Sequence, residues 1–182
     1  MGVFSYVGFF LCCVLFFGVV LSHADTTLQN DTISTICPNT SNPLLCWQML
    51  KPVRNLDSVS LTNYTLNFIR TSAVECLHYA QGLEAKETAN LELKKRYSYC
   101  SKSIKSTVTD IEVAQEYMGY GSYIVADLNT MGAFTDSGDC LNSFNQPPPE
   151  PSALQKSIKN LNDICEIACH LTHFIAGDDA WT

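Results

Sequence analysis

The chain has 182 residues, a length that suits one domain, and 46% of them are hydrophobic, which is enough to build a buried core. Its 18 acidic residues outnumber its 11 basic residues, so the formal net charge is −7. An acidic surface argues against nucleic acid or an anionic membrane as a partner and favours a basic protein, although the same charge can serve solubility alone.

Residues 1–24 predict a secretory signal peptide. They contain no Asp, Glu, Lys or Arg, and an apolar run over residues 7–21 ends at Ser22-His23-Ala24, which places small residues at the two positions that a signal peptidase reads. The run is short for a membrane span of about 20 residues. We therefore expect cleavage before Asp25 and a secreted mature domain over residues 25–182.

Secretion changes what the cysteines can do. Cleavage removes Cys12 and Cys13 from the nine cysteines of the chain, and an oxidising compartment permits disulfides among the odd number that remain, with at least one thiol left over. The mature chain also contains Asn-x-Ser/Thr sequons, and each asparagine must lie at the surface if it is glycosylated. The sequons begin at Asn30, Asn39 and Asn63.

Residues 25–60 predict turns and short helices rather than one long helix. Cys37 and Cys46 bound a compact segment that contains Pro38 and Pro43. Two prolines this close together interrupt a helix, so the segment is expected to form a short helical hairpin.

Long amphipathic helices are predicted from about Leu61, because apolar residues recur there at steps of three and four. One face of the first helix carries Phe68, Ser72, Cys76, Tyr79 and Leu83, and it is widened by Leu66, Ile69, Ala73, Leu77 and Ala80. The stripe of the second helix consists of Leu93, Tyr97, Cys100, Ile104, Val108, Ile111 and Met118. Gly119-Tyr120-Gly121 ends this helix in a turn.

Two more helices are predicted beyond that turn. The third is shorter, and its stripe consists of Ile124, Leu128, Met131 and Phe134. Pro147-Pro148-Pro149-Glu150-Pro151 is a stiff connector that no helix crosses, and Ser152-Ala153-Leu154-Gln155 has the pattern of a capping box that opens the last helix. The last stripe consists of Leu154, Ile158, Leu161, Cys165, Ala168, Thr172 and Ile175.

Four amphipathic helices with mostly short connectors predict an all-α fold. We expect an up-and-down four-helix bundle preceded by the short N-terminal hairpin, because each helix can bury its stripe only against the others. No strand-like alternation of useful length is present. Closely repeated Leu, Ile, Val and Phe residues predict a filled core, which disfavours a small-ligand carrier that would use the interior of the bundle.

Catalysis finds little support in the sequence. The chain has no Gly-x-Ser-x-Gly elbow, no His-Glu-x-x-His motif and no phosphate-binding loop. Asp110, Glu112 and Glu116 could in principle supply the carboxylate pair of a glycosidase. Carboxylates along one helix are usually a solvated face, however, so we expect no catalytic residue and no cofactor.

The cysteines and histidines of the last helix offer one further possibility. Cys165, Cys169 and His173 lie at steps of four, and together with His170 or Cys76 they could ligate zinc. We prefer to interpret Cys165 as a small buried hydrophobe, because secreted cysteines oxidise more often than they bind metal. A third disulfide that joins Cys76 to this helix across the bundle is left open.

Several spaced motifs occur in order along the mature chain: Cys37-x2-Thr40-x2-Pro43-x2-Cys46-x3-Leu50, then Cys100, then Met131-Gly132-Ala133-Phe134, then Cys140-Leu141-Asn142-Ser143-Phe144. Together they resemble the pattern of the plant invertase and pectin methylesterase inhibitor family over essentially the whole mature chain. The chain departs from the family at three positions. Asn142 replaces an Asp, Tyr99 replaces an acidic residue, and Ile104 replaces an aromatic one.

The resemblance implies disulfides between Cys37 and Cys46 and between Cys100 and Cys140. It also implies a protein that is not an enzyme but binds one, in a one-to-one complex in the plant cell wall or apoplast. The expected target is pectin methylesterase, and the alternative is cell-wall or vacuolar invertase. The Pro-Lys-Phe motif associated with the invertase branch does not occur here, which favours pectin methylesterase. Exposed positions on the second to fourth long helices would form the contact surface, with candidates Lys102, Lys105, Asp110, Glu112 and Glu116.

Overall fold

The computed structural model describes residues 31–53 and 55–177. Its elements are a 3-10 helix, η1 (Cys37–Asn39), and the helices α2 (Pro43–Leu50), α3 (Ser58–Lys86), α4 (Leu91–Gly119), α5 (Tyr123–Ser143) and α6 (Leu154–Ala176), while residues 31–36 are helical as well. The described residues contain no strand. The predicted signal peptide, its cleavage site and Asn30 lie outside the described residues.

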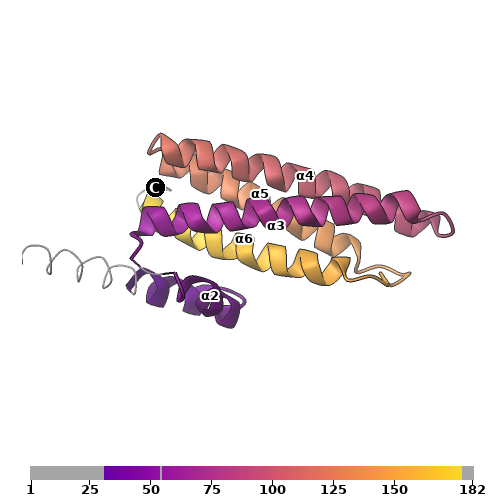
Figure 1. Cartoon of the computed structure of the whole chain (residues 1–182), viewed down its shortest axis with the longest axis horizontal. Coiled ribbons are helices and arrows are strands. Elements are labelled where there is room, and N and C mark those ends of the chain that lie inside the picture. The colour runs from indigo at the N-terminus through magenta and orange to yellow at the C-terminus, as the bar shows by residue number, and fades with distance from the viewer. Residues whose placement is uncertain (1–30, 54, 178–182) are drawn as a thin grey trace, which may run out of the picture.

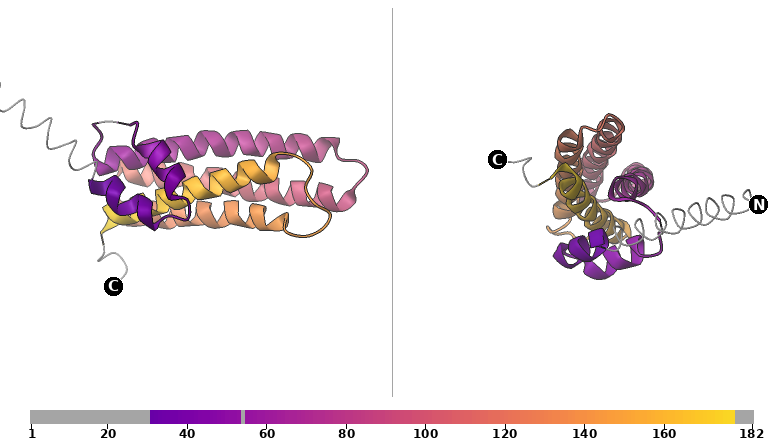
Figure 2. Two further views of the ribbon diagram at one scale, coloured as in Figure 1. Left: turned by 90° about the horizontal axis from the view of Figure 1, so that it is seen from below. Right: turned by 90° about the vertical axis from the view of Figure 1, so that its left-hand side faces the viewer.

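The four long helices form an up-and-down bundle (Figure 1). Helices that follow one another in the chain pack together, and α6 packs back against α3 to close the ring. The N-terminal hairpin lies outside the bundle against α6 (Figure 2). The predicted fold is therefore confirmed. Within the described part of the chain, no helix has both the length and the apolar character needed to cross a membrane.

Local capping explains where the helices begin. The Asp57 carboxylate accepts a hydrogen bond from the Ser60 amide at 2.6 Å, and the Asn90 side chain accepts from the amides of the first turn of α4. At α6 the predicted capping box is half right. The Ser152 hydroxyl accepts from the Leu154 amide at 3.0 Å, but the Ser152 amide donates to Glu150 rather than to Gln155.

The predicted buried faces of α4 and α6 are confirmed. Their stripes lie in one core cluster, in which Ile104, Ile111, Ile158 and Cys165 have no exposed surface. The face predicted for α3 is shifted, because Phe68 is 42% exposed and Tyr79 is 39% exposed. The flanking set supplies most of the residues of α3 that pack into the core, namely Leu66, Ile69, Ala73 and Ala80, and Cys76 of the predicted face joins them.

The predicted stripe of α5 is wrong. Ile124, Leu128, Met131 and Phe134 are 45%, 48%, 47% and 37% exposed. The face that enters the core carries mostly small side chains instead. Its buried residues are Ala126, Asp127, Thr130, Ala133, Ser137 and Cys140. Small side chains let the α5 backbone approach its neighbours closely, and Thr130 satisfies its buried hydroxyl by donating to the Ala126 carbonyl at 2.8 Å.

The described part of the chain contains two disulfides, with the pairing that the family resemblance implies. Cys37–Cys46 closes the hairpin, with a Cα–Cα distance of 5.4 Å. Cys100–Cys140 joins α4 to α5, with a Cα–Cα distance of 4.4 Å and a separation of 40 residues in the sequence. The second bond therefore fixes α5, with its exposed apolar residues, against α4.

Side-chain contacts attach the hairpin to α6. The Glu166 carboxylate accepts hydrogen bonds from the Ser41 amide and hydroxyl, and Asn42 Nδ2 donates to Asp163 Oδ2 at 3.0 Å. Beneath these bonds lies a separate apolar cluster that includes Ile33, Ile36, Leu50, Leu61, Ile167 and Leu171. The hairpin is thus part of the folded domain and covers the outer face of α6.

The proline-rich connector is anchored to α4. Arg96 Nη1 donates to the carbonyls of Gln146 and Pro148 at 2.7 and 2.9 Å, and the Tyr97 hydroxyl donates to Glu150 Oε1 at 2.9 Å. Burial and the bond to Glu150 raise the pKa of Tyr97 above its ordinary value, so the hydroxyl stays protonated and donates.

We expect Tyr97→Phe to lower the free energy of unfolding by about 1.5 kcal/mol, because a hydrogen bond from a buried hydroxyl to a carboxylate is lost while the ring is kept. Urea denaturation measures this change. Tyr99→Phe is the matched control, since Tyr99 lies on the same helix and is 48% exposed. Equal effects of the two changes would contradict the anchoring role of Tyr97.

Candidate functional site

Four exposed apolar side chains follow one side of α5. We call Ile124, Leu128, Met131 and Phe134 the α5 ridge. Their spacing of three and four residues aligns them along the helix. Soluble proteins rarely expose a contiguous apolar patch without a use for it, and such patches often mark protein-binding sites. The ridge lies along one helix, so it suits insertion into an elongated cleft of a partner.

Acidic residues flank the ridge. α5 carries Asp136 and Asp139 beside the ridge and no Lys or Arg, whereas its third acidic residue, Asp127, is buried and accepts a hydrogen bond from the Thr172 hydroxyl at 2.7 Å. The carboxyl of Asp136 interacts with that of Asp110 on α4, and we call these two residues the acid pair. Burial, with the nearby charge of Asp136, raises the pKa of Asp110, while burial and the charge of Asp139 raise the pKa of Asp136. This face of the protein is therefore apolar and acidic, which favours a basic partner.

Close packing of α4 on α5 brings the acid pair together. A Cβ atom added to Gly132 would lie 2.6 Å from Asp110 Oδ2. The absence of a side chain at Gly132 thus leaves room for the Asp110 carboxylate between the two helices.

We expect Asp136→Asn to stabilise the fold by about 0.5 kcal/mol at pH 7. The pKa values of both carboxyls are raised in the folded state, so folding favours their protonated forms. Their contribution to the free energy of unfolding is therefore fully present below the ordinary pKa of an aspartate, and it is lost as the pH rises through the pKa values of the folded state. The uncharged amide of the Asp136→Asn variant avoids the loss of stability that the wild-type protein suffers as the pH rises. The variant should therefore be more stable than the wild type at pH 7 and equally stable near pH 3.

Thermal melting at pH 3 and pH 7 tests this expectation. Glu84→Gln on α3 is the control, since it changes the net charge by the same amount away from the acid pair. An advantage of Asp136→Asn that is the same at both pH values would contradict the raised pKa values of the acid pair.

The charged candidates from the sequence do not form one surface. Lys102 and Lys105 are exposed on α4. Asp110 faces α5, whereas Glu112 accepts a hydrogen bond from Arg70 Nε of α3 at 3.1 Å. Glu116 accepts from the Tyr120 hydroxyl at 3.1 Å. Because Asp110 and Glu112 point to opposite sides of α4, these carboxylates do not converge as the pair of a glycosidase would.

The remaining thiols are those of Cys76, Cys165 and Cys169. Burial raises the pKa of Cys76 to about 11 and that of Cys165 to about 12, and it raises the pKa of Cys169 as well. Cys165 lies in the core, as predicted. His173 Nδ1 lies 3.3 Å from Asp127 Oδ2. Over residues 31–53 and 55–177, no group of three or more potential ligands could hold a metal ion, so the zinc hypothesis gains no support.

Two of the predicted sequons can be placed in the structure. Asn39 is exposed, and its Nδ2 donates to the Thr35 carbonyl at 2.8 Å. Asn63 is half-buried on α3, and the Thr65 of its sequon is fully buried. Glycosylation at Asn39 and Asn63 stays a prediction, with Asn39 the more accessible of the two.

Comparison with known proteins places the chain among inhibitors. A model of the family described as plant invertase/pectin methylesterase inhibitor matches residues 31–171. A pectinesterase inhibitor from Actinidia deliciosa is 27% identical over 170 residues, which cover 92% of this chain and 91% of that protein. Pectinesterase inhibitor 2 from Arabidopsis thaliana is 24% identical over 146 residues, which cover 79% of this chain and 83% of that protein.

A solved structure has the same fold. The crystal structure of mutant form A of a pectin methylesterase inhibitor from Arabidopsis superposes with a TM-score of 0.72 and 22% sequence identity. The match covers 77% of this chain and 94% of that one. At this identity the likeness supports the helical architecture, and the function must be argued from the relatives and from the exposed surface.

Proposed function

Because the chain belongs to the plant invertase/pectin methylesterase inhibitor family, we propose that it is a secreted protein that binds and blocks pectin methylesterase in the plant cell wall. The observation that carries the proposal is the α5 ridge, a row of exposed apolar side chains in a chain similar to proteins named as inhibitors of this enzyme. The chain acts by occupying a cleft and performs no chemistry of its own.

The ridge can reach into a long cleft. A helix of the length of α5 spans about 30 Å, and its exposed apolar residues extend over most of its first four turns. Insertion would remove these side chains from water and exclude substrate from the same space. One such ridge per chain supports a one-to-one complex.

Charge favours the same encounter. The chain has a net charge of −7, and the flank of the ridge carries Asp110, Asp136 and Asp139. An acidic inhibitor attracts a basic enzyme before the two proteins touch. Salt screens this attraction, so that at 0.1 M it is weak beyond roughly 10 Å. The acidic flank therefore contributes mainly to the rate of association.

Pectin methylesterase is preferred over invertase on two grounds. The relatives given above are named for pectinesterase, and the chain lacks the Pro-Lys-Phe motif. Secretion rests on the predicted signal peptide of residues 1–24, and the disulfides Cys37–Cys46 and Cys100–Cys140 suit an oxidising compartment.

The test is an inhibition assay with purified residues 25–182. We expect pectin methylesterase activity to fall in proportion to the complex formed, with an apparent association rate that decreases between 0.05 and about 0.3 M salt. The protein alone should release no methanol from pectin. Inhibition of invertase with no effect on pectin methylesterase would support the alternative target instead, and no inhibition of either enzyme would overturn the proposal.

A further inference from the structure

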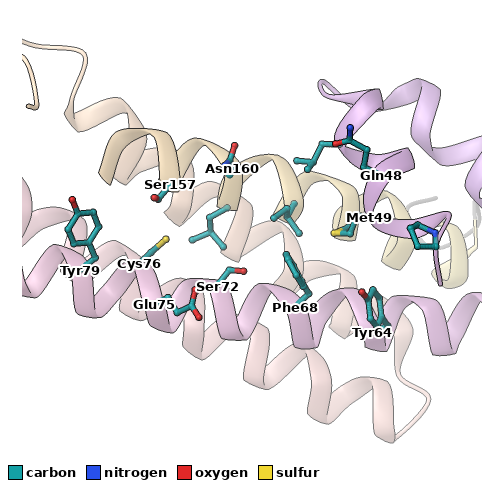
Figure 3. Close-up of a pocket in the computed structure, with 14 residues that line it drawn as sticks. Gln48, Met49, Tyr64, Phe68, Ser72, Glu75, Cys76, Tyr79, Ser157 and Asn160 are labelled. Atoms are coloured by element: carbon teal, nitrogen blue, oxygen red, sulfur yellow. The ribbon is translucent and has the colours of Figure 1, made fainter. Parts of the chain in front are cut away.

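A groove of about 750 Å³ runs along the seam between α3 and α6, below α2 (Figure 3). Its lining comes from these elements and from Pro52, and none of it comes from α4 or α5. The groove is therefore separate from the α5 ridge. Its volume lies in the range of about 300–1,000 Å³ that is typical of small-molecule sites.

Apolar side chains form most of the groove. Met49 of α2 and Phe68 of α3 lie on opposite sides of it (Figure 3), and Leu161 and Ile164 of α6 also line it. The sequence predicts that Phe68 and Tyr79 face the bundle interior, but they line this groove instead. Their position explains why both side chains are partly exposed. The groove extends from Tyr64 to Tyr79, which is about 22 Å along a helix. An elongated ligand suits this shape.

The charge of the groove selects among elongated ligands. Glu75 is the one charged residue among the lining residues, and no Lys or Arg accompanies it. Tyr64, Phe68 and Tyr79 add aromatic rings, whose faces attract cations. A carboxylate beside aromatic rings favours a cationic group over an anionic one, because an anion would meet Glu75 without compensation.

We propose that this groove is a binding site for an elongated apolar molecule that carries an ammonium group. The ammonium lies beside Glu75 and Tyr79, and the apolar chain runs along Phe68, Leu161 and Ile164 toward Met49. Gln48, Ser72, Ser157 and Asn160 supply polar atoms along the groove. The proposal does not depend on inhibition of pectin methylesterase, because the two surfaces share no residue.

The experiment is calorimetric titration with three probes of equal chain length, below the concentrations at which they form micelles. We expect dodecylamine to bind about fivefold more tightly than dodecan-1-ol, because only the amine forms an ion pair with Glu75 and an exposed ion pair contributes little more than this. Dodecanoate should bind least tightly, because its carboxylate is repelled by Glu75. Equal binding of the amine and the alcohol, or no binding of either, would overturn the proposal.

Variants separate this site from general attraction to an acidic protein. Glu75→Gln should abolish the preference for the amine and leave the affinity for the alcohol unchanged. Phe68→Ala should lower the affinity for both probes. The matched controls are Asp139→Asn and Phe134→Ala on α5, which should change neither affinity. If Asp139→Asn reduced amine binding as much as Glu75→Gln, the amine would be responding to net charge and the proposed site would be wrong.

Discussion

Replacing Cys100 and Cys140 together by alanine is expected to lower the free energy of unfolding by about 4 kcal/mol. The disulfide closes a loop of 40 residues between α4 and α5, and both cysteines are fully buried. Without the disulfide the unfolded chain has a higher conformational entropy, which stabilises the unfolded state. The alanine side chains keep most of the packing between α4 and α5. Urea denaturation of both proteins under non-reducing conditions measures the difference.

The N-terminal disulfide provides the comparison. Cys37→Ala with Cys46→Ala opens a loop with a separation of only 9 residues, and the same chain-entropy model gives about 2.6 kcal/mol. The order of the two effects should thus follow loop length. If removal of Cys100–Cys140 changed stability by less than 1 kcal/mol, the bond would not be what holds α5 to α4, and the position of the ridge would need another explanation.

Replacing Leu128 and Met131 together by aspartate is expected to weaken inhibition of pectin methylesterase at least tenfold. Interface residues of this kind often contribute 2 kcal/mol or more when they are removed from a buried contact, and added charges would have to be desolvated as well. Both side chains are about half exposed, so the melting temperature should change little. The inhibition constant at fixed salt is the measurement.

The groove supplies a matched control for this prediction. Phe68→Asp places the same charge at a side chain of similar exposure, 42%, on α3. It should leave inhibition unchanged while it abolishes binding of the dodecyl probes. The opposite pattern, with inhibition lost through Phe68→Asp and kept through the α5 changes, would move the inhibitory surface to the groove.

The sequence by itself determined the class of the fold and the stripes of α4 and α6. In these helices, large apolar residues at steps of three and four have no partner except the core, so periodicity alone identifies the buried face. The prolines at 147–149 and 151 likewise end one helix before the next begins, because proline breaks a helix wherever it occurs in the interior. The order of the cysteines led to the family, and the match over residues 31–171 confirmed it.

Only the tertiary structure decided which face of α5 is buried and which groups meet across the bundle. Periodicity predicts that Leu128 and Met131 are buried, because they are large and apolar. In the structure Ala126, Ala133 and Cys140 are buried instead, because only small side chains fit where α5 packs closely against α4 and α6. Asp110 and Asp136 lie far apart in the sequence, and their carboxyls influence each other only because α4 and α5 pack closely. The exposed ridge, the acid pair and the groove between α3 and α6 all depend on distances between helices, and a pattern within one helix does not contain those distances.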